Sequence, residues 1–364
     1  MDRAVRDGVF PGAVLAVRQA GELRFLLAAG RVSTDPPGDA VQPSTIYDLA
    51  SLTKPLVTVT SILLLLQAGK LELGEAVQSV LPELSGFPVG STTISDLLTH
   101  SSGLPGWRPL YERLEAGGLV AGETPSATLR QAVLQLIRDE PLIYGRGERS
   151  LYSDLGFILL GLAVERLAGV SLDAYFEAAI AAPLQARPLL YSPLEPRSAA
   201  PPIDASRIAP SERVERKGRC LRGEVHDDNA ASMGGVAGHA GLFGTAEAVL
   251  CVSGAWLRAH GGEPSLLDHR LVREFTRRQA QIPQSSWALG WDTPSVSSSS
   301  GSLFSPESFG HLGYTGTSLW IDPLKELEVV LLSNRVHPTR RNEQIKTFRP
   351  LIHDLAVRES GVLR

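Results

Sequence analysis

The chain has 364 residues, of which 43% are hydrophobic and 20% charged, and its mean hydropathy is +0.02. At roughly 150 residues per domain, this length predicts two domains or one large composite domain with ample apolar side chains for a core. A net charge of −4 without a basic stripe argues against a nucleic-acid or membrane-surface partner. The longest apolar run, 62–66, is far too short to cross a bilayer.

The N-terminus and the cysteines bear on the cellular compartment. Charges in residues 1–7 are not followed by an apolar segment, so this stretch does not read as a signal peptide. We therefore expect a cytoplasmic protein, unless a leader precedes this sequence. Cys220 and Cys251 lack CxxC spacing, which excludes a disulfide framework and a metal site and predicts two free thiols.

In chain order, residues 2–8 predict a short helix, and 12–17 with 23–29 predict a hairpin around 19–21. A loop over 31–45 and a short strand over 46–49 follow. One helix is then expected over 51–69, because apolar residues recur at helical spacing and Gly69 supplies a stop. They are Leu56, Val59, Ile62, Leu63 and Leu66.

Ser51 and Lys54 lie at the start of this expected helix, about one turn apart on one face. That geometry suits a nucleophile and its base, provided that burial or nearby cations lower the pKa of the lysine. Pro55 falls in the first turn, where a missing N–H matters least. By itself the Ser-x-x-Lys spacing equally fits an ordinary core helix with a serine cap and a snorkelling lysine.

From 72 to 150 the pattern is helical and broken by Gly and Pro. Helices are expected at 93–99, 128–138, 155–167 and, capped by Ser171, at 172–181. Seven prolines between 182 and 225 exclude long helices and central strands there. We expect that segment to form a functional rim or to drape over the surface.

The C-terminal third turns to strands. The glycine-rich stretch 234–241 fits neither GxGxxG nor a P-loop, which argues against nucleotide binding. After a helix over 246–257, strands are expected at 287–291, 303–311, 317–321 and 328–332, with a flexible serine-rich loop at 297–302 and a final helix over 342–357. This order predicts an α/β (α+β) fold. Residues 1–75 and 245–364 would form a mostly antiparallel sheet flanked by the terminal helices, and 76–244 a mainly helical domain that closes over a cleft.

Two further stretches carry polar residues of catalytic types. Tyr152 could shuttle a proton if a neighbouring lysine favours its phenolate, although Ser153 or Asp154 also suits a helix N-cap and Tyr152 a half-buried core residue. Glycines in 310–317 would let a backbone or a ligand approach a strand closely, and the plainer interpretation there is a bulged strand with a surface histidine.

Together these stretches resemble the serine β-lactamase and penicillin-binding protein superfamily, in particular its class C-like branch of esterases and peptidases. Ser51-Leu52-Thr53-Lys54 is similar to its first motif, Tyr152-Ser153-Asp154 to Tyr-x-Asn, and His311-Leu312-Gly313 to Lys-Thr-Gly or His-x-Gly. Residues 97–104 are also similar to a phrase common in this branch. Tyr314-Thr315-Gly316 is a rival register for the third motif. The resemblance covers nearly the whole chain, and three motifs in this order are fairly specific.

The resemblance implies a role for each site residue. Ser51 would attack a carbonyl and become acylated, while Lys54 and Tyr152 together move the proton, with either one as the base. The N–H groups of Ser51 and Tyr314 would form the oxyanion hole. Substrate would be bound by Asp154, His311, Gly313 and Tyr314.

Two positions depart from the family pattern. Asp154 replaces an amide donor by a charge, and His311 replaces a permanent cation, so anionic β-lactams should be held weakly. His311 should be mostly neutral near pH 7 and become charged as the pH falls toward 6. We therefore expect acyl transfer to water through an acyl-enzyme, without metal or cofactor, with small esters or amides as the first choice of substrate. A β-lactamase or a D-amino-acid or cell-wall peptidase is one alternative, and a non-catalytic penicillin-binding or ligand-sensing homologue is another.

Three histidines receive structural interpretations. His100 is expected to anchor a loop, and His239 to bond to backbone, with a place on the wall of the cleft as the alternative. His226 begins a His-Asp-Asp run without a second histidine at useful spacing, which argues against metal. The absence of G-x-S-x-G excludes an α/β-hydrolase. The sequence does not indicate an oligomeric state.

Overall fold

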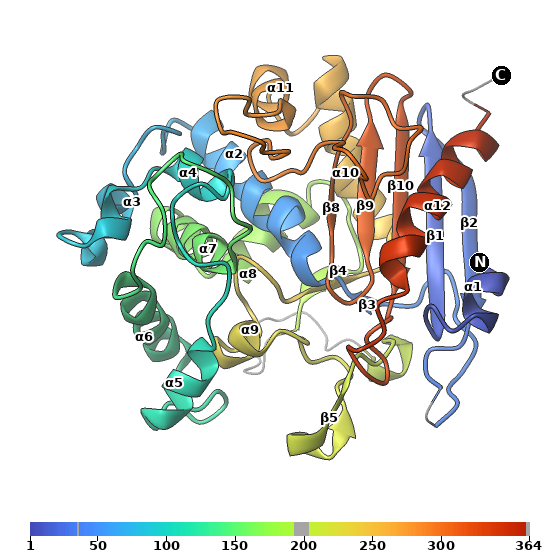
Figure 1. The fold of residues 1–364 in the computed structure, drawn as a ribbon, viewed down its shortest axis with the longest axis horizontal. Coiled ribbons are helices and arrows are strands. Elements are labelled where there is room, and N and C mark those ends of the chain that lie inside the picture. Colours follow the sequence, from blue (N-terminus) through green and yellow to red (C-terminus); the bar gives the residue numbers. More distant parts are fainter. Residues whose placement is uncertain (35, 193–203, 362–364) are drawn as a thin grey trace.

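The computed structural model describes residues 1–34, 36–192 and 204–361. A five-stranded antiparallel sheet forms one side of the molecule and a cluster of helices forms the other (Figure 1). The strand order is β2-β1-β10-β9-β8, so both ends of the chain build one sheet, as predicted. The bounds are β1 Gly12–Gln19, β2 Glu22–Gly30, β8 Phe309–Leu312, β9 Ser318–Asp322 and β10 Leu327–Ser333.

The predicted hairpin joins β1 to β2. Ala20 and Gly21 both have positive φ, 49° and 77°, the pattern of the two-residue turn whose twist matches that of the flanking strands. Alternate residues of β1 then face two cores. Val14 and Ala16 belong to the main core, while Leu15 and Val17 belong to a smaller core under the C-terminal helix.

Helices cover both faces of the sheet (Figure 1). The C-terminal helix α12 (Ile345–Glu359) lies across the front of β1 and β10, and α10 (Ala246–Gly261) lies behind them. The short helix α1 (Asp2–Arg6) packs beside β2, and α11 (His269–Thr276), which the sequence did not predict, packs on α10. These terminal helices and the predicted helix after residue 245 are confirmed.

The helical side is organised around α7 (Asp154–Ala168), where ten residues are buried. Its N-cap is Ser153, whose hydroxyl accepts from Gly156 N–H, and it ends at Gly169 in the left-handed conformation. The predicted helices at 93–99 and 128–138 appear as α4 and α6. The other elements here are α3 Val77–Val80, α4 Ile94–Leu98, α5 Leu110–Ala116, α6 Ser126–Arg138, α8 Leu172–Phe176 and α9 Asp228–Ser232.

The prediction of a single α-helix over 51–69 is wrong for the first half of that range. A 3₁₀ turn, η1 (Ala50–Leu52), is followed by a π-helical stretch, η2 (Lys54–Val59), and only then by α2 (Thr60–Gln67). Pro55 supplies no N–H in this stretch, and the Thr60 hydroxyl donates to the Pro55 carbonyl at 2.9 Å. The run Ala50–Gln67 is long and apolar enough to pass as a candidate membrane span, but 78% of it is buried inside the protein, and a core helix passes the same test.

Other differences lie at turns. No strand forms over 287–291, because Gly290 has φ of 80° and closes a tight turn between Ala288 and Trp291. The strand expected over 303–311 is confined to β8. The serine-rich loop is tied to α12, since the N–H groups of Ser302 and Leu303 both donate to Asp354. Ser171 stands at the N-cap of α8 without a side-chain capping bond, and a π-helical turn, η5 (Glu177–Ala181), continues that helix.

The described part of the proline-rich segment 182–225 contains no long helix, as predicted. It contributes an edge strand, β4 (Leu189–Tyr191), to a small sheet with β7 (Leu242–Gly244) in the centre and β3 (Tyr47–Asp48) on the far side. A two-stranded hairpin, β5 (Arg213–Val214) and β6 (Arg219–Cys220), follows. Residues 193–203 lie outside the described residues. Cys220 and Cys251 do not form a disulfide with each other.

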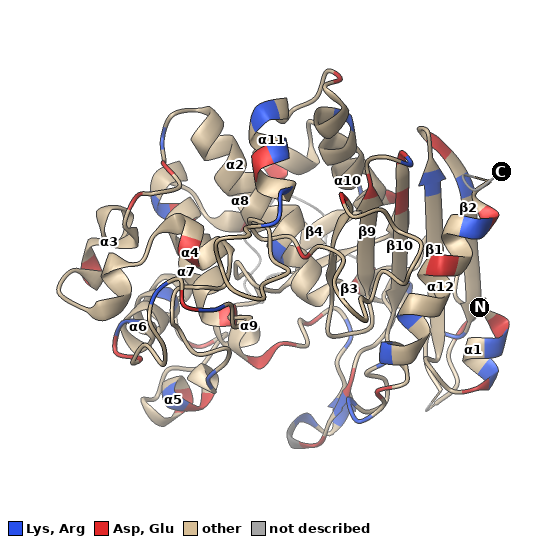
Figure 2. Ribbon diagram, turned by 45° about the horizontal axis from the view of Figure 1, so that its top comes forward, with Lys and Arg blue, Asp and Glu red and all other residues tan. Residues whose placement is uncertain are grey.

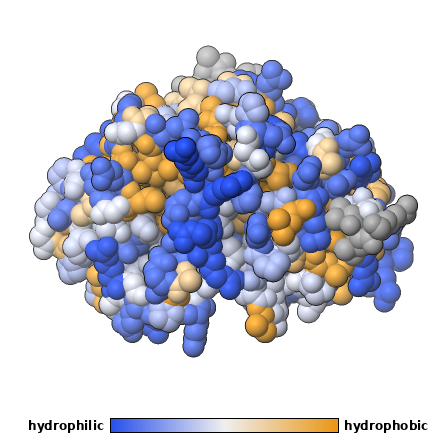
Figure 3. Space-filling view, turned by 90° about the horizontal axis from the view of Figure 1, so that it is seen from above, coloured by the Kyte–Doolittle hydropathy of each residue, from blue (hydrophilic) through white to orange (hydrophobic). Residues whose placement is uncertain are grey.

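The surface fits the composition. Basic and acidic residues are interspersed along helices and loops (Figure 2). On the face seen from above, hydrophobic residues gather in small patches among hydrophilic ones (Figure 3). The division of the chain into 1–75 with 245–364 and 76–244 stays a prediction.

Candidate active site

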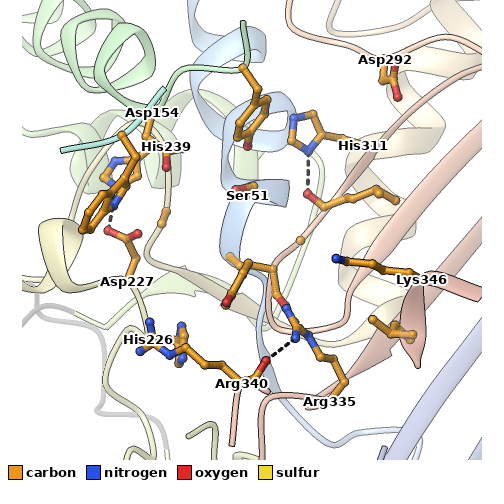
Figure 4. Close-up of a pocket in the computed structure, with 18 of the residues that line it drawn as sticks. Ser51, Asp154, His226, Asp227, His239, Asp292, His311, Arg335, Arg340 and Lys346 are labelled. Atoms are coloured by element: carbon orange, nitrogen blue, oxygen red, sulfur yellow. Dashed lines mark hydrogen bonds and ion pairs between the residues drawn. The ribbon is translucent and has the colours of Figure 1, made fainter. Parts of the chain in front are cut away.

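A pocket of about 600 Å³ lies where the helical side meets the edge strand β8 (Figure 4). It brings together residues from opposite ends of the chain, including every predicted site residue except Lys54, whose fully buried side chain lies beneath Ser51. Such a concave site with convergent polar groups is typical of small-molecule binding. Its further lining residues used below are Trp107, His226, Asp227, His239, Trp287, Asp292, Arg335, Arg340, Lys346 and Arg349.

The backbone before Ser51 is held in a strained shape. Ala50 has φ of 48°, a left-handed conformation that costs a non-glycine residue free energy. Asp48 secures it: one carboxylate oxygen accepts from Ala50 N–H at 2.8 Å and the other from His226 N–H at 2.7 Å. This local strain places Ser51 at the pocket surface, where its side chain is accessible to substrate.

Lys54 uses all three of its ammonium protons. Its Nζ donates to Ser51 Oγ at 3.0 Å, to Asp154 Oδ1 at 2.7 Å and to the His239 carbonyl at 3.1 Å. Burial lowers the pKa of Lys54, but the charge of Asp154, with a smaller contribution from Tyr152, outweighs burial and raises that pKa above its usual range. In this state Lys54 is therefore an ammonium ion that cannot accept the proton of Ser51.

Tyr152 lies beside the same group, with its ring centroid 4.8 Å from Lys54 Nζ. Burial raises the pKa of Tyr152, although Lys54 opposes that rise, so the phenol keeps its proton at neutral pH. The His100 ring packs at 4.7 Å and the Trp287 ring at 5.6 Å. His100 also accepts from Ser153 N–H through Nδ1 at 3.0 Å, which is the loop-anchoring contact that the sequence predicted.

The loop over 313–317 is fastened to the segment that precedes Ser51. Thr315 Oγ1 donates to the Asp48 carbonyl at 2.7 Å, and Thr317 Oγ1 donates to the Leu49 carbonyl at 3.0 Å. Gly313 has no room for a side chain, because a Cβ there would collide with Thr317 and with the Leu49 carbonyl. Among the residues described, the Tyr314 N–H donates no hydrogen bond, so it is free to bind a ligand oxygen.

His311 is a neutral hydrogen-bond acceptor. Its Nδ1 lies 2.8 Å from the Leu312 carbonyl, which can only accept, so Nδ1 carries the proton and Nε2 presents a lone pair. That Nε2 is buried and has no partner within the described chain. Burial, together with the nearby charge of Lys54, lowers the pKa of His311 to about 3. The expectation that His311 becomes charged toward pH 6 is therefore wrong, since Asp154 is engaged by Lys54 and does not compensate a second cation.

The other histidines of the pocket belong to separate networks. His239 Nε2 lies 2.8 Å from Asp227 Oδ1, and His226 Nε2 lies 3.0 Å from Glu212 Oε2. Although burial raises it, the pKa of Asp227 is held well below its usual range by the charge and hydrogen bond of His239. Among residues 1–34, 36–192 and 204–361, no group of three or more His, Cys, Asp or Glu side chains could hold a metal ion.

Sequence reasoning missed the basic side of the pocket. Arg335 and Arg340 come from the loop after β10, and Lys346 and Arg349 come from α12. Figure 4 shows Arg335 and Lys346 on the side of the pocket away from Asp154 and Asp227, whereas Arg340 lies beside His226, with which it shares Glu212 as a partner. No motif marks these residues, because their place at the pocket depends on how the last loop and helix pack.

Comparison with known proteins agrees with this architecture. Residues 1–353 match the Beta-lactamase family. Putative D-alanyl-D-alanine carboxypeptidases of Salmonella heidelberg (strain SL476) and Salmonella typhi are each 33% identical to the chain over 237 residues, which are 62% of this chain and 54% of each relative. The chain thus spans about half the length of the curated relatives it matches.

Solved structures share the fold at low identity. EstCE1, a hydrolase with promiscuous acyltransferase activity, has a TM-score of 0.71 at 19% identity, covering 96% of this chain and 95% of that one. The octameric penicillin-binding protein homologue from Pyrococcus abyssi has a TM-score of 0.70 at 20% identity, covering 98% of this chain and 77% of that one. A class C beta lactamase from Rhodobacter sphaeroides has a TM-score of 0.68 at 20% identity, covering 97% of this chain and 97% of that one.

These likenesses confirm the predicted fold, a mixed α/β structure with an antiparallel sheet and a helical region. The family match extends over nearly all of the chain, and it includes the three motifs singled out in the sequence. The chain therefore belongs to the Beta-lactamase family.

Proposed function

We propose that the protein is a serine hydrolase that works through an acyl-enzyme on Ser51, with small neutral esters or amides as substrates. The observation that carries the proposal is the contact between Lys54 Nζ and Ser51 Oγ, 3.0 Å apart at the floor of a pocket of about 600 Å³. A serine hydroxyl with a proton-transfer partner at this distance is the arrangement that nucleophilic catalysis requires.

In the acylation step, Ser51 Oγ attacks the substrate carbonyl carbon, the bond to the leaving group breaks, and the leaving group takes up a proton. Since Lys54 already holds three protons, it must pass one on before it accepts the proton of Ser51. Asp154 is suited to receive that proton, because its Oδ1 lies 2.7 Å from Lys54 Nζ. Water then attacks the acyl-enzyme, which releases the acid and restores Ser51.

Stabilisation of the oxyanion would come from backbone donors. Tyr314 N–H has no other partner in the described structure, and the threonine bonds from its loop hold it beside the segment that leads into Ser51. One donor of this kind is typically worth about 3–4 kcal/mol in the transition state. The position of Tyr314 just beyond β8 favours His311-Leu312-Gly313 as the register of the third motif.

Neutral substrates are favoured by the groups around Ser51. His311 stays uncharged, Lys54 and Asp154 neutralise each other, and the walls carry the aromatic side chains of Trp107 and Trp287. A short acyl chain would contact these rings without having to place a charge against them.

A second candidate is a β-lactamase or D-peptidase that binds an anionic substrate. The basic side of the pocket favours it, and the Salmonella relatives are named putative D-alanyl-D-alanine carboxypeptidases. However, Arg340 already pairs with Glu212 and Lys346 with Glu343. Both cations would have to be shared with a substrate carboxylate, which weakens their pull.

Turnover of a p-nitrophenyl butyrate, nitrocefin and a D-alanyl-D-alanine peptide should be compared in wild type and Ser51→Ala, together with labelling by a fluorophosphonate probe. We expect the highest kcat/KM on the ester, and loss of turnover and labelling in Ser51→Ala with an unchanged circular dichroism spectrum. Mass spectrometry should place the adduct on the peptide that carries Ser51. An adduct on another residue would refute the nucleophile, and labelling without turnover of any substrate would favour a ligand sensor.

A further inference from the structure

Two buried arginines donate hydrogen bonds to the carbonyls of the loop that carries the free Tyr314 N–H. Arg349, on α12, donates from one guanidinium nitrogen to the carbonyls of Gly313 and Thr317, both at 2.7 Å. Arg335, after β10, donates to the Tyr314 carbonyl at 2.9 Å, and its guanidinium lies 4.4 Å from the centroid of the Tyr314 ring. Only 6% of Arg349 and 5% of Arg335 is exposed.

Neither arginine forms an ion pair with a carboxylate in the described structure. Arg335 contacts the carbonyls of Arg340 and Asn342 in addition to Tyr314, and Arg349 Nε has no partner. Burial, together with the charge of Arg335, lowers the pKa of Arg349 to about 9. A buried charge that only carbonyl dipoles compensate is costly for folding, and well-packed apolar side chains often replace such groups without loss. The cost therefore points to a role other than stability.

The direction of one peptide bond indicates that role. The Gly313–Tyr314 peptide is trans, so its C=O and its N–H point in opposite directions. The C=O points at Arg349 and also accepts from Gly316 N–H at 3.1 Å. The Tyr314 N–H of the same peptide must then point away from Arg349. A cation on the carbonyl side also draws electron density from the amide, which strengthens its N–H as a donor.

We propose that Arg349 is the positioning residue of the oxyanion hole: it orients the Gly313–Tyr314 peptide and, through its charge, makes Tyr314 N–H a stronger donor to the oxyanion formed on attack by Ser51. The inference rests on the proposed function. It differs from a purely structural role, in which Arg349 would only tie α12 to the sheet.

The two roles predict different effects of charge. Arg349→Lys keeps the cation, whereas Arg349→Gln keeps amide donors on a shorter side chain without the charge. An oxyanion role requires that Lys retains more turnover than Gln at equal folding. Arg349→Met removes charge and donors together, and it should lower kcat by up to about 100- to 1000-fold, the loss typical of complete removal of one oxyanion donor, with little change in KM.

A boronic acid provides the second measurement. Ser51 Oγ adds to the boron of an arylboronic acid and releases a proton to solvent, which leaves a tetrahedral anionic adduct that resembles the transition state. The inhibition constant should rise from Arg349→Lys to Arg349→Gln to Arg349→Met, in proportion to the loss of kcat/KM on p-nitrophenyl butyrate. A structural role would leave the boronate affinity of the folded fraction unchanged.

Arg18→Met is the matched control, because Arg18 is also largely buried but pairs with Glu328 on the sheet, away from the pocket. Arg18→Met should lower the free energy of unfolding and leave kcat and boronate affinity unchanged. Arg349→Met should instead lower kcat and boronate affinity and leave the free energy of unfolding nearly unchanged. If Arg349→Gln matches wild type or exceeds Arg349→Lys in both readouts, the inference is wrong, even if the Met variant fails to fold. If wild type neither cleaves the ester nor binds the boronate, the proposed function itself fails, and the inference with it.

Discussion

Replacing Asp154 by asparagine should move the pH dependence of catalysis toward acid. Asp154 Oδ1 lies 2.7 Å from the buried Nζ of Lys54, and its charge raises the pKa of both Lys54 and Tyr152. Asparagine has nearly the same shape and still offers an oxygen to Lys54, but it carries no charge. Whichever of Lys54 and Tyr152 is the base, the substitution makes its deprotonated form easier to reach.

The size of the shift follows from the strength of the pair. At an effective dielectric of about 20, two unit charges at this separation attract by about 6 kcal/mol, and removal of one partner of a buried pair typically costs about 3–5 kcal/mol. Taking about 3 kcal/mol, the acid limb of kcat/KM on a neutral ester should move by about two pH units, since one unit corresponds to about 1.36 kcal/mol. At pH 6 the variant should therefore be faster than wild type relative to its own maximum.

The same substitution, Asp154→Asn, should make the folded protein less stable. Because the pKa of Lys54 is raised in the folded protein, the stabilisation from its pair is fully present at neutral pH and is lost only as the pH rises through the folded value, above the usual 10.5. Asp154→Asn should then lower the free energy of unfolding at pH 7 by at most about 3 kcal/mol, because Lys54 can release its proton instead of remaining unpaired.

The assay is kcat/KM on p-nitrophenyl butyrate from pH 5 to pH 9, with urea unfolding at pH 7. Asp292→Asn is the matched control: Asp292 also lines the pocket, but it bonds to Ser286 and does not touch Lys54. That control should keep the wild-type profile. An unchanged or alkaline-shifted profile in Asp154→Asn would refute the charge coupling between Asp154 and the proton-transfer pair.

Three further predictions follow from the same geometry. Lys54→Ala and Tyr152→Phe should each slow acylation by about 100-fold or more, and stopped-flow rates of the double variant should show a loss much smaller than their product, whereas multiplicative losses would leave Tyr152 a packing residue. His311→Lys combined with Asp154→Asn should shift the kcat/KM ratio of nitrocefin to ester by about 1–3 kcal/mol in favour of nitrocefin, because it adds a cation and removes an anion; no shift would show that these positions do not set specificity. Glu212→Gln should lower the free energy of unfolding at pH 7 by about 2 kcal/mol, because hydrogen bonds to His226 and Arg340 hold the pKa of Glu212 at about 2. Urea unfolding should show that the difference between variant and wild type shrinks as the pH falls from 4.5 toward 2. A difference that does not change with pH would contradict this assignment.

Local pattern was enough for the elements and for the first members of the site. Helical spacing located α7, and the glycine after Ala20 marked the hairpin, because these features depend on neighbours in the chain. The family motifs located Ser51, Lys54 and Tyr152. In the structure Ser51 and Tyr152 line one pocket, and Lys54 lies buried beneath Ser51. The same reasoning failed where backbone geometry depends on distant contacts, as in the π-helical start of the helix behind Ser51 and the turn at Gly290.

Charge states and the basic side of the pocket depended on tertiary structure alone. A sequence shows that Asp154 stands where an amide is usual, but only packing shows that its carboxylate neutralises Lys54 and leaves His311 without a compensating acid. Likewise nothing in the sequence marks Arg349, 36 residues after Gly313, as the group that orients the Tyr314 peptide. A pKa and a hydrogen-bond direction are set by burial and by groups a few ångströms away in space, and these distances come into being only when the chain folds.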